Sequence, residues 1–185
     1  VSDAVLKAMS DTVSPQGLIS LCYKTEDNFS ELSPTGSSTF IYLHEIQDPG
    51  NAGTILRTAD AMGISAVITS PDSVDMFSPK VVRSTAGSLW HIPVYEGISF
   101  DLLDKQFPDI QKLLLSSHAK TSLIDLDIPG DCIAIFGNEA RGVSAADLGA
   151  EVTEVTIPMA GRAESLNLSA AASIVMFTLS SKVAG

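Results

Sequence analysis

The chain has 185 residues, of which 45% are hydrophobic and 18% are charged, so it can fill the core of a single domain and cannot be disordered throughout. Its 11 Lys and Arg residues against 22 Asp and Glu residues give a formal net charge of −11, which argues against a broad basic surface for nucleic acid. The two cysteines, Cys22 and Cys132, lie in apolar runs. This pattern excludes a disulfide scaffold or a zinc ribbon and favours a reducing compartment.

The sequence shows neither a secretion signal nor a membrane span. Residues 1–10 lack a basic region followed by an apolar one. The longest uncharged stretch, 165–181, is diluted by Ser, Thr and Asn, whereas a spanning helix needs about 20 predominantly apolar residues. We therefore expect a soluble, cytoplasmic protein with no membrane contact. Because the chain begins with Val1 rather than Met, we also expect it to be a piece of a longer protein.

The opening part differs in kind from the rest of the chain. Residues 1–24 predict a short helix, a turn and then a first strand at 18–22. Residues 25–38 are polar and contain Pro, Gly and several Ser, which is typical of a loop or linker. We therefore expect 25–38 to connect the opening segment to a main domain over 39–185.

From residue 39 onward, short apolar runs alternate with helical segments. Strands are predicted at 40–43, 66–69, 91–94, 112–115, 132–136 and 152–157. Helices are predicted at 52–62, 79–86, 100–106, 145–148 and 167–182. This rhythm predicts an α/β fold, with a mostly parallel sheet that carries helices on both faces.

Small and polar residues follow four of the predicted strands. These loop segments are 48–63, 116–118, 137–144 and 158–169. Parallel α/β sheets bind their ligands at the carboxyl ends of their strands. Gly in such loops lets the backbone approach a ligand and present its N–H groups. The sequence therefore predicts one binding site at this edge of the sheet.

The four arginines sharpen this prediction. Arg57, Arg141 and Arg162 lie in these loops or in the helix that one of them opens, and Arg83 lies in a helical segment bounded by Gly. Rigid planar cations in Gly-rich loops of an acidic chain suggest recognition of phosphate or carboxylate. The alternative is that each arginine caps a helix or pairs with one of the many acids.

Several common site motifs are absent from the sequence. It has no GxxxxGK[ST] loop, no GxGxxG fingerprint, no HExxH cluster and no GxSxG elbow. These absences argue against a Walker-type NTPase, a dinucleotide oxidoreductase and a catalytic metal, so no metal is expected. His44, His91 and His118 are far apart in the sequence, and each is more readily interpreted as structural.

Three of these loop segments contain short sequence blocks with a recognisable spacing. The first block, Asn-x-Gly-x-x-x-Arg, is matched by Asn51, Gly53 and Arg57. The second, Gly-x-Glu-x-x-Gly, is matched by Gly137, Glu139 and Gly142. The third is Ile-Pro-Met followed by Ser-Leu-Asn-Leu-Ser, at 157–159 and 165–169. Together the three blocks resemble those of the SpoU-type (TrmH-like) RNA ribose 2′-O-methyltransferases of the SPOUT class. The resemblance covers nearly all of 39–182 and implies a deep C-terminal trefoil knot.

The resemblance implies which residues form the site. The residues it places at contacts to S-adenosyl-L-methionine are Ser116, Gly137, Ile157, Met159 and Leu166. The residues it places at or beside the reacting ribose are Asn51, Arg57, Glu139, Ser165 and Asn167. Arg57, Arg141 and Arg162 are candidates for RNA binding. Asn51 and Asn167 fit equally well as helix N-caps, and Ile157 and Leu166 fit equally well as core residues.

Arg57 is the first candidate for catalysis, because it falls off the apolar line of its helix. A guanidinium has a pKa above about 12, which argues against a free neutral base at physiological pH. We therefore expect Arg57 to hold the adjoining phosphate and to stabilise the developing alkoxide, with transient acceptance of the proton as the alternative.

The implied activity is methyl transfer from S-adenosyl-L-methionine to a ribose 2′-hydroxyl of rRNA or tRNA, with rRNA favoured. The alternative is a catalytically idle RNA-binding or ribosome-assembly factor that kept the fold. The resemblance also implies a homodimer packed through the last helix. Residues 1–24 resemble the tail of a small substrate-binding domain, which would share the RNA affinity and would reconcile an acidic chain with an RNA substrate.

Overall fold

Seven parallel strands form one sheet in the computed structural model, which describes residues 1–24, 28–149 and 151–183. The strand order across the sheet is β3-β2-β1-β6-β4-β7-β5. The strands are β1 Thr39–Leu43, β2 Ala66–Thr69, β3 Val94–Tyr95, β4 Gln111–Leu115, β5 Thr121–Ser122, β6 Cys132–Phe136 and β7 Thr153–Thr156. The predicted α/β class with a parallel sheet is confirmed.

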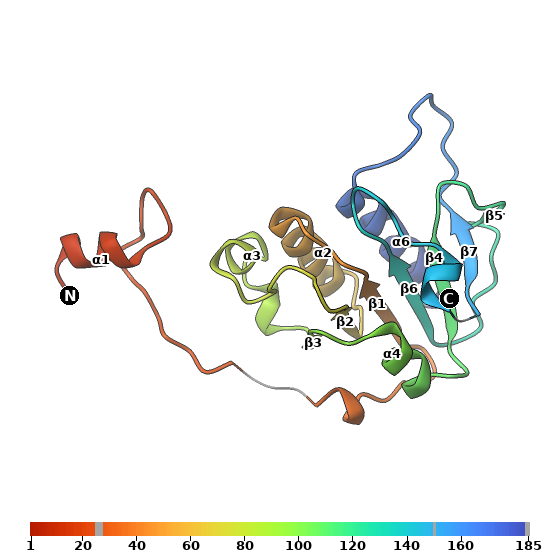
Figure 1. Cartoon of the computed structure of the whole chain (residues 1–185), viewed down its shortest axis with the longest axis horizontal. Helices are drawn as coiled ribbons and strands as arrows, with labels where there is room; N and C mark the ends of the chain where they lie inside the picture. Colours follow the sequence, from red (N-terminus) through yellow and green to blue (C-terminus); the bar gives the residue numbers. More distant parts are fainter. Residues whose placement is uncertain (25–27, 150, 184–185) are drawn as a thin grey trace.

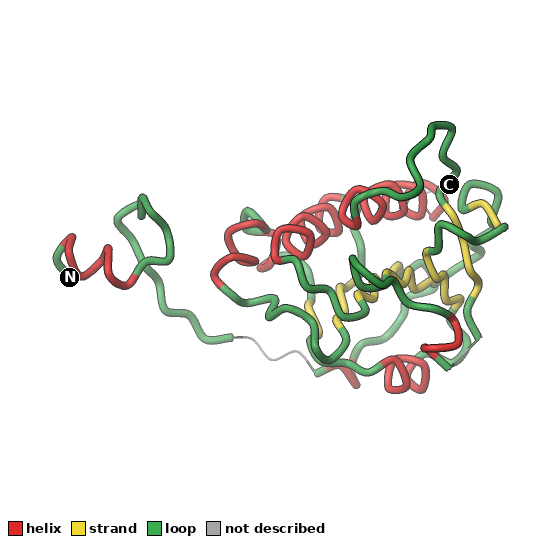
Figure 2. The backbone as a smooth tube through the Cα atoms, turned by 45° about the horizontal axis from the view of Figure 1, so that its top comes forward, coloured by secondary structure: helices red, strands yellow, loops and turns green. Residues whose placement is uncertain are grey.

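Helices cover both faces of the sheet (Figures 1 and 2). One face carries α2, α3, α6 and the short turn η2, and the other carries α4, α5 and the short turn η1. Their bounds are α1 Asp3–Met9, η1 Phe29–Glu31, α2 Pro49–Ala61, α3 Pro79–Ser84, η2 Ser88–Trp90, α4 Phe100–Gln106, α5 Ala145–Leu148 and α6 Leu168–Val183. Within the described residues, none of these helices is long and apolar enough to cross a membrane.

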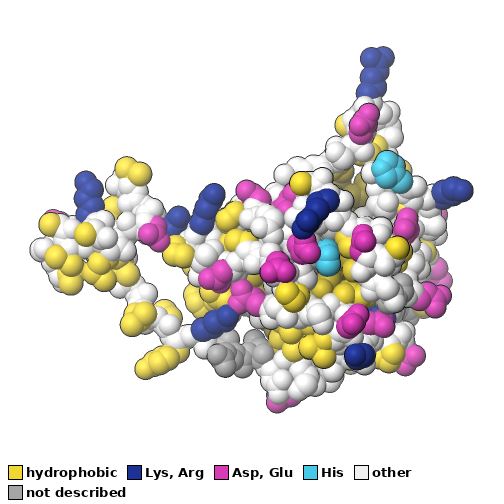
Figure 3. Space-filling model, viewed as in Figure 1, with side chains coloured by type: hydrophobic (Ala, Val, Ile, Leu, Met, Phe, Trp, Pro, Cys, Tyr) yellow, Lys and Arg dark blue, Asp and Glu magenta, His cyan; other side chains and the backbone are white. Residues whose placement is uncertain are grey.

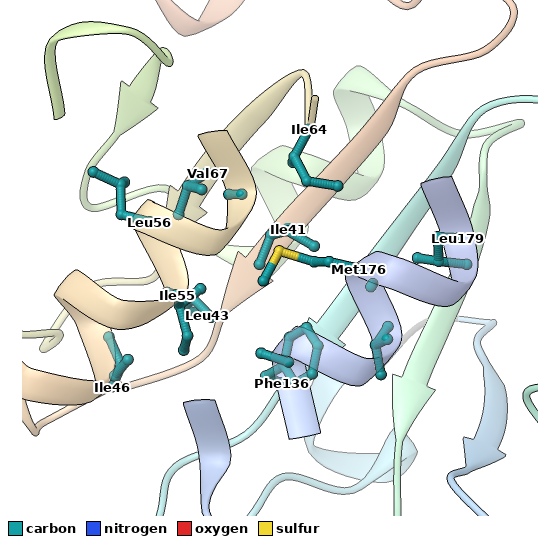
Figure 4. Close-up of a cluster of buried hydrophobic side chains, with 14 of the residues drawn as sticks. Ile41, Leu43, Ile46, Ile55, Leu56, Ile64, Val67, Phe136, Met176 and Leu179 are labelled. Atoms are coloured by element: carbon teal, nitrogen blue, oxygen red, sulfur yellow. The ribbon is translucent and has the colours of Figure 1, made fainter. Parts of the chain in front are cut away.

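The central strands are buried on both faces, which is why they read as unbroken apolar runs. All five residues of β1 are buried, and successive side chains enter opposite cores. Ile41 and Leu43 pack with α2 and α6, whereas Phe40 and Tyr42 pack on the α4 face. Figure 4 shows Met176 of α6 reaching toward Ile41 in the first of these cores.

The pairing of β1 with β6 positions the loops that matter most. Leu43 at the end of β1 lies beside Phe136 at the end of β6, although the two are far apart in sequence. The segments that follow, 44–51 and 137–143, therefore start side by side at the carboxyl edge of the sheet. Strand β7 joins the same edge through its parallel pairing with β4.

The α2 and α3 helices approach closely at Gly53. A Cβ added at Gly53 would meet Oγ of Ser84 at 1.7 Å and the Ser84 backbone carbon at 2.9 Å. Ser84 in turn donates its hydroxyl to the carbonyl of Pro49, 3.0 Å away, at the start of α2. Gly53 is thus required for packing between two helices, and this packing fixes the direction of α2.

The opening segment lies away from the sheet (Figure 1). Helix α1 forms as predicted, but the strand predicted at 18–22 does not. Leu18, Leu21 and Tyr23 are 80–102% exposed, so these residues have no neighbouring strand to pair with and no core to enter. Figure 3 shows apolar side chains gathered on this segment.

Two further differences from the predictions have simple causes. Three residues of the predicted linker 25–38, residues 25–27, lie outside the described part of the chain. The rest of the linker includes the short turn η1, whose Phe29 is buried against the rings of Tyr95 and Phe107. Strand β3 begins at Val94 rather than at 91, because residues 88–91 wind as a short turn whose His91 bonds Asp60 of α2. The trefoil knot stays a prediction.

Candidate functional site

A cavity of about 660 Å³ opens at the carboxyl ends of β4, β6 and β7. It is lined by loop residues that follow these three strands and by the start of α6, with Asn51 of α2 at its margin. A second hollow lies beside it and shares Asn51, Asn138, Glu139 and Asn167 with it. This is the place where the sequence predicted a binding site.

Gly137 is the first residue after β6 and lines the cavity. A Cβ at this position would lie 2.4 Å from the backbone nitrogen of Val143 and 2.5 Å from the backbone carbon of Gly142. The chain folds back on itself here, with a bridge between Asn138 and Gly142. Only Gly leaves room for this turn, so the loop 137–143 can present its backbone to the cavity.

Glu139 ties this loop to the start of α2. Its Oε1 accepts the backbone N–H of Asp48 at 3.0 Å and the side-chain amide of Asn51 at 3.3 Å. Its Oε2 accepts the backbone N–H of Gln47 at 3.1 Å. Burial raises the pKa of Glu139, but these donors and the backbone N–H of Glu139 itself outweigh it, so the net pKa is lowered. Glu139 is therefore a carboxylate at neutral pH and acts as a hydrogen-bond acceptor.

Asn51 and Asn167 carry the same network across to α6. The amide of Asn167 donates to the Asn51 side-chain oxygen at 3.1 Å. The Asn167 side-chain oxygen also accepts the backbone N–H of Ser169 at 2.9 Å, as an N-cap does. At α2, the cap is Asp48, which accepts the backbone N–H of Asn51 at 2.7 Å. Asn167 is thus a cap and a site residue together, and Asn51 is not itself the cap.

The residues predicted around the methyl donor lie together. Ser116, Gly137, Ile157, Met159 and Leu166 all line the cavity. Of those predicted at the ribose, Asn51, Glu139, Ser165 and Asn167 line it as well. Five loops and helix ends that are far apart in sequence therefore meet at one rim.

The three candidate arginines are divided by the structure. Arg141 lines the cavity, with 71% of its side chain exposed, and pairs with the carboxylate of Glu45. Arg57 is exposed on α2 and is not among the described residues that line the cavity. Arg162 is exposed in the segment between β7 and α6 and also lies outside the lining.

Sequence reasoning missed several lining residues, among them two acids. Asp147 forms a capping box with Ser144 at the start of α5, and the Ser144 hydrogen bonds lower the pKa of Asp147. Glu154 lies on β7, inside a segment that the sequence analysis interpreted only as a strand. His118, interpreted as structural, lines the cavity as well, and its place directly after a strand was the available signal.

The cavity is acidic. Glu139, Asp147 and Glu154 contribute three carboxylates to its lining, against the single guanidinium of Arg141. Figure 3 shows acidic side chains scattered over the visible face of the body as well. In the described part of the chain, no three His, Cys, Asp or Glu side chains are grouped in a way that could hold a metal ion.

Comparison with known proteins shows which family shares this sequence and architecture. The model of the SpoU rRNA Methylase family matches residues 38–177. An uncharacterised tRNA/rRNA methyltransferase of Synechocystis is 37% identical over 179 residues, covering 96% of this chain and 65% of that protein. The 23S rRNA (guanosine(2553)-2′-O)-methyltransferase RlmP of Bacillus subtilis is 32% identical, covering 97% of this chain and 71% of that protein.

A solved structure of a SpoU methyltransferase has a similar fold. The SpoU methyltransferase AviRb of Streptomyces viridochromogenes, in complex with the cofactor AdoMet, matches with a TM-score of 0.78 and 28% identity, covering 87% of this chain and 67% of that chain. This chain spans about two thirds of the length of the relatives that it matches. The match over 38–177 takes in every strand of the sheet and the rim of the cavity, and the chain belongs to the SpoU rRNA methylase family.

Proposed function

We propose that this chain transfers a methyl group from S-adenosyl-L-methionine to a ribose 2′-hydroxyl of rRNA or tRNA, with rRNA favoured. The observation that carries the proposal is the convergence of Asn51, Glu139 and Asn167 in one hydrogen-bonded chain beside the Gly137 wall. The relatives support it, since the Bacillus subtilis protein is a 23S rRNA 2′-O-methyltransferase.

The cavity fits the proposed donor in size and chemistry. Its volume of about 660 Å³ lies in the usual range for small-molecule sites, roughly 300–1,000 Å³. Leu115, Phe136 and Ile157 give an apolar wall suited to an adenine ring. When bound, S-adenosyl-L-methionine would supply an electrophilic methyl group on a sulfonium, and three carboxylates in the lining suit that positive charge.

The residues of the rim are proposed to align the acceptor. Asn51, Glu139 and Asn167 hold one another in fixed positions, so the ribose would meet a preorganised edge. Ser165 lies at the same rim. Arg57 lies outside the cavity, which suits a group that grips the phosphate next to the target ribose and stabilises the developing alkoxide. Arg162 is proposed to contact RNA phosphates. For Arg141, which lines the cavity, an RNA phosphate is the alternative to an anionic group of the donor.

The opening segment and the acidity of the chain support a shared RNA interface. We propose that residues 1–24 are the end of a small substrate-binding domain, which would account for the exposed apolar side chains of Leu18, Leu21 and Tyr23. RNA affinity would then be divided between that domain and this one, which carries a net charge of −11.

We further propose a homodimer, a trefoil knot that includes α6, and a cytoplasmic location. Ile174 and Phe177 are 42% and 63% exposed on α6, whose other side packs into the core. Exposed apolar side chains on a helix whose opposite side is buried are typical of a helix-packed interface. Light scattering should give twice 19.4 kDa for this chain, and Phe177→Asp should shift it to 19.4 kDa.

The activity is tested first by methyl incorporation into bulk RNA together with calorimetric binding of S-adenosyl-L-methionine. Binding without incorporation by the full-length protein would favour an idle RNA-binding factor over an enzyme. Arg57→Ala should abolish incorporation and leave the dissociation constant of the donor nearly unchanged, because Arg57 is not in the lining. Equal loss of binding and incorporation would show that Arg57 is structural.

A further inference from the structure

Glu45 lies immediately behind the cavity wall, in a backbone conformation that few residues adopt. Its φ is 52°, and within the described residues it is one of three non-Gly residues with positive φ. This left-handed region is costly for a residue with a Cβ, by about 1–3 kcal/mol, and persists only where the surroundings enforce it. Glu45 follows β1 directly, at the edge where the site is built.

Three contacts from two other loops enforce this conformation. The Glu45 N–H donates to Oγ of Ser70 at 2.7 Å. Its carbonyl accepts the side-chain amide of Asn138 at 2.8 Å. Its carboxylate pairs with the guanidinium of Arg141. Two of the three partners belong to the loop 137–143, which is the wall of the cavity.

The contact with Asn138 shapes that loop from behind. Asn138 is 8% exposed, and its side-chain oxygen accepts the backbone N–H groups of Ala140 at 3.0 Å and Arg141 at 3.2 Å. Without the Glu45 carbonyl, the buried amide of Asn138 would lose the acceptor that it has here. The Glu45 backbone therefore supports the turn, while its carboxylate pairs with Arg141 and lies 3.8 Å from Nε2 of His44.

Arg141 is the only Lys or Arg among the described residues that line the cavity. Its side chain is long and 71% exposed, so without a partner it would sample many rotamers. The guanidinium is planar and has five donors, so one edge can stay on Glu45 while another binds an anionic group of a ligand. The carboxylate of the methyl donor is such a group, and an RNA phosphate has the same chemistry.

We propose that Glu45 is a positioning residue that holds Arg141 at the rim of the cavity, where Arg141 receives the carboxylate of the methyl donor. The inference rests on the proposed function. Glu45 touches no reacting atom; it lies outside the lining and acts through Arg141. Its effect is therefore expected on donor affinity, seen as a raised KM for the donor with an unchanged kcat.

Calorimetry on the full chain tests this with two probes, S-adenosyl-L-methionine and its decarboxylated form. The wild-type chain should prefer the carboxylated probe by about two- to fivefold, the range of a partly exposed ion pair. Glu45→Gln, Arg141→Gln and the double variant should each lose that preference to the same extent, because the two residues act as one unit. Additive losses, or a preference unchanged in Glu45→Gln, would overturn the proposal.

Two further variants separate this role from a structural one. Glu45→Gly removes the side chain and relieves the left-handed backbone, so the melting temperature should stay level or rise while the preference is lost. If the melting temperature falls together with the preference, the effect of Glu45 is structural and a positioning role is contradicted. Glu31→Gln makes the same charge change on a turn outside the cavity lining and should alter neither quantity.

A measurement of RNA binding distinguishes the two anions that Arg141 could bind, the donor carboxylate and an RNA phosphate. If Glu45→Gln weakens RNA binding and leaves the preference between the two donors intact, Arg141 serves a phosphate instead and the proposal is overturned. Failure of the proposed function has a different signature, because the wild-type chain would then bind neither donor probe.

Discussion

The two sides of the cavity differ in how firmly they are held. On one side, the segments 44–51 and 137–143, here called the tied wall, are joined by hydrogen bonds through Glu45, Asn138 and Glu139. On the other side, residues 158–166, here called the projecting loop, stand out from the body (Figures 1 and 2). Within the described chain, no residue of the projecting loop forms a hydrogen bond to another residue.

This difference indicates a division of tasks. The tied wall has its geometry before any ligand arrives, as a site for a small donor requires. The projecting loop has few internal constraints and exposes Arg162, as a surface that adapts to a large partner does. Variants that change one side alone test this contrast.

The largest effect is expected from Gly137→Ala. The new Cβ would collide with backbone atoms of Gly142 and Val143, so the tied wall must shift. We expect a loss of about 1–3 kcal/mol in the free energy of unfolding and a fall of about 100-fold in the methylation rate, since displacement by about 1 Å can cost that much. Gly161→Ala in the projecting loop is the matched control. Its Cβ meets no atom within 4 Å, so stability and rate should not change.

Glu139→Gln is expected to have the next largest effect. A neutral amide would turn an NH₂ group toward donors that now meet a carboxylate oxygen, at a cost of about 1–2 kcal/mol in the free energy of unfolding. Urea unfolding at pH 7 measures this cost. Glu164→Gln, at an exposed site in the projecting loop, should change stability by far less.

The effect of Glu139→Gln on the free energy of unfolding should depend on pH. The folded-state pKa of Glu139 is lowered, so its stabilisation is complete above the ordinary glutamate value of about 4.3 and is lost as the pH falls through the lowered pKa. The difference in unfolding free energy between wild type and Glu139→Gln should be constant from pH 7 to pH 5 and should shrink below pH 4.3. A difference that grows on acidification would contradict this assignment.

Asn167→Ala is expected to have a smaller effect on stability. It removes the cap of α6 and the bond to Asn51, and loss of a cap costs about 1 kcal/mol. Because Asn167 also joins the tied wall to α6, methylation should fall further than stability alone explains. Asn28→Ala removes the cap of η1, away from the cavity, and should leave methylation per folded molecule unchanged.

The smallest effect is expected from Arg162→Ala. It should leave the melting temperature and donor affinity unchanged, because Arg162 is exposed and makes no bond in the described chain. RNA affinity should fall by roughly threefold, and the slope of log affinity against log salt should decrease by about 1. If the slope of log affinity against log salt equals that of the wild type, Arg162 does not contact an RNA phosphate.

The sequence predicted most of the sheet and most of the rim, for one physical reason. Strands buried on both faces, such as β1 and β6, must be apolar along their length, and in a parallel sheet the loops after them must share an edge. Strand β5 was missed because its two residues, Thr121 and Ser122, are polar and too few to form a pattern.

Features set by tertiary contacts were not predictable in the same way. The helix periodicity did not determine the direction in which Arg57 faces. That direction follows from the orientation of α2, which the packing of Gly53 on Ser84 fixes. The left-handed conformation of Glu45 carries no sequence signal, because Glu is not a residue that favours it. The pairing of Asn51 with Asn167 likewise depends on two helix starts meeting in space.

The pairing of β1 with β6 also has a consequence for how the protein is made. Phe40 and Ile133 are neighbours in the sheet, and the rim closes only when Asn167 reaches Asn51. During synthesis, β1 cannot pair with β6 until the chain from Thr39 to Cys132, a separation of 93 residues, has emerged, and the rim cannot close until Asn167 has followed. Contacts so distant in sequence slow folding, and until β6 emerges the nascent protein leaves one edge of β1 without its partner strand.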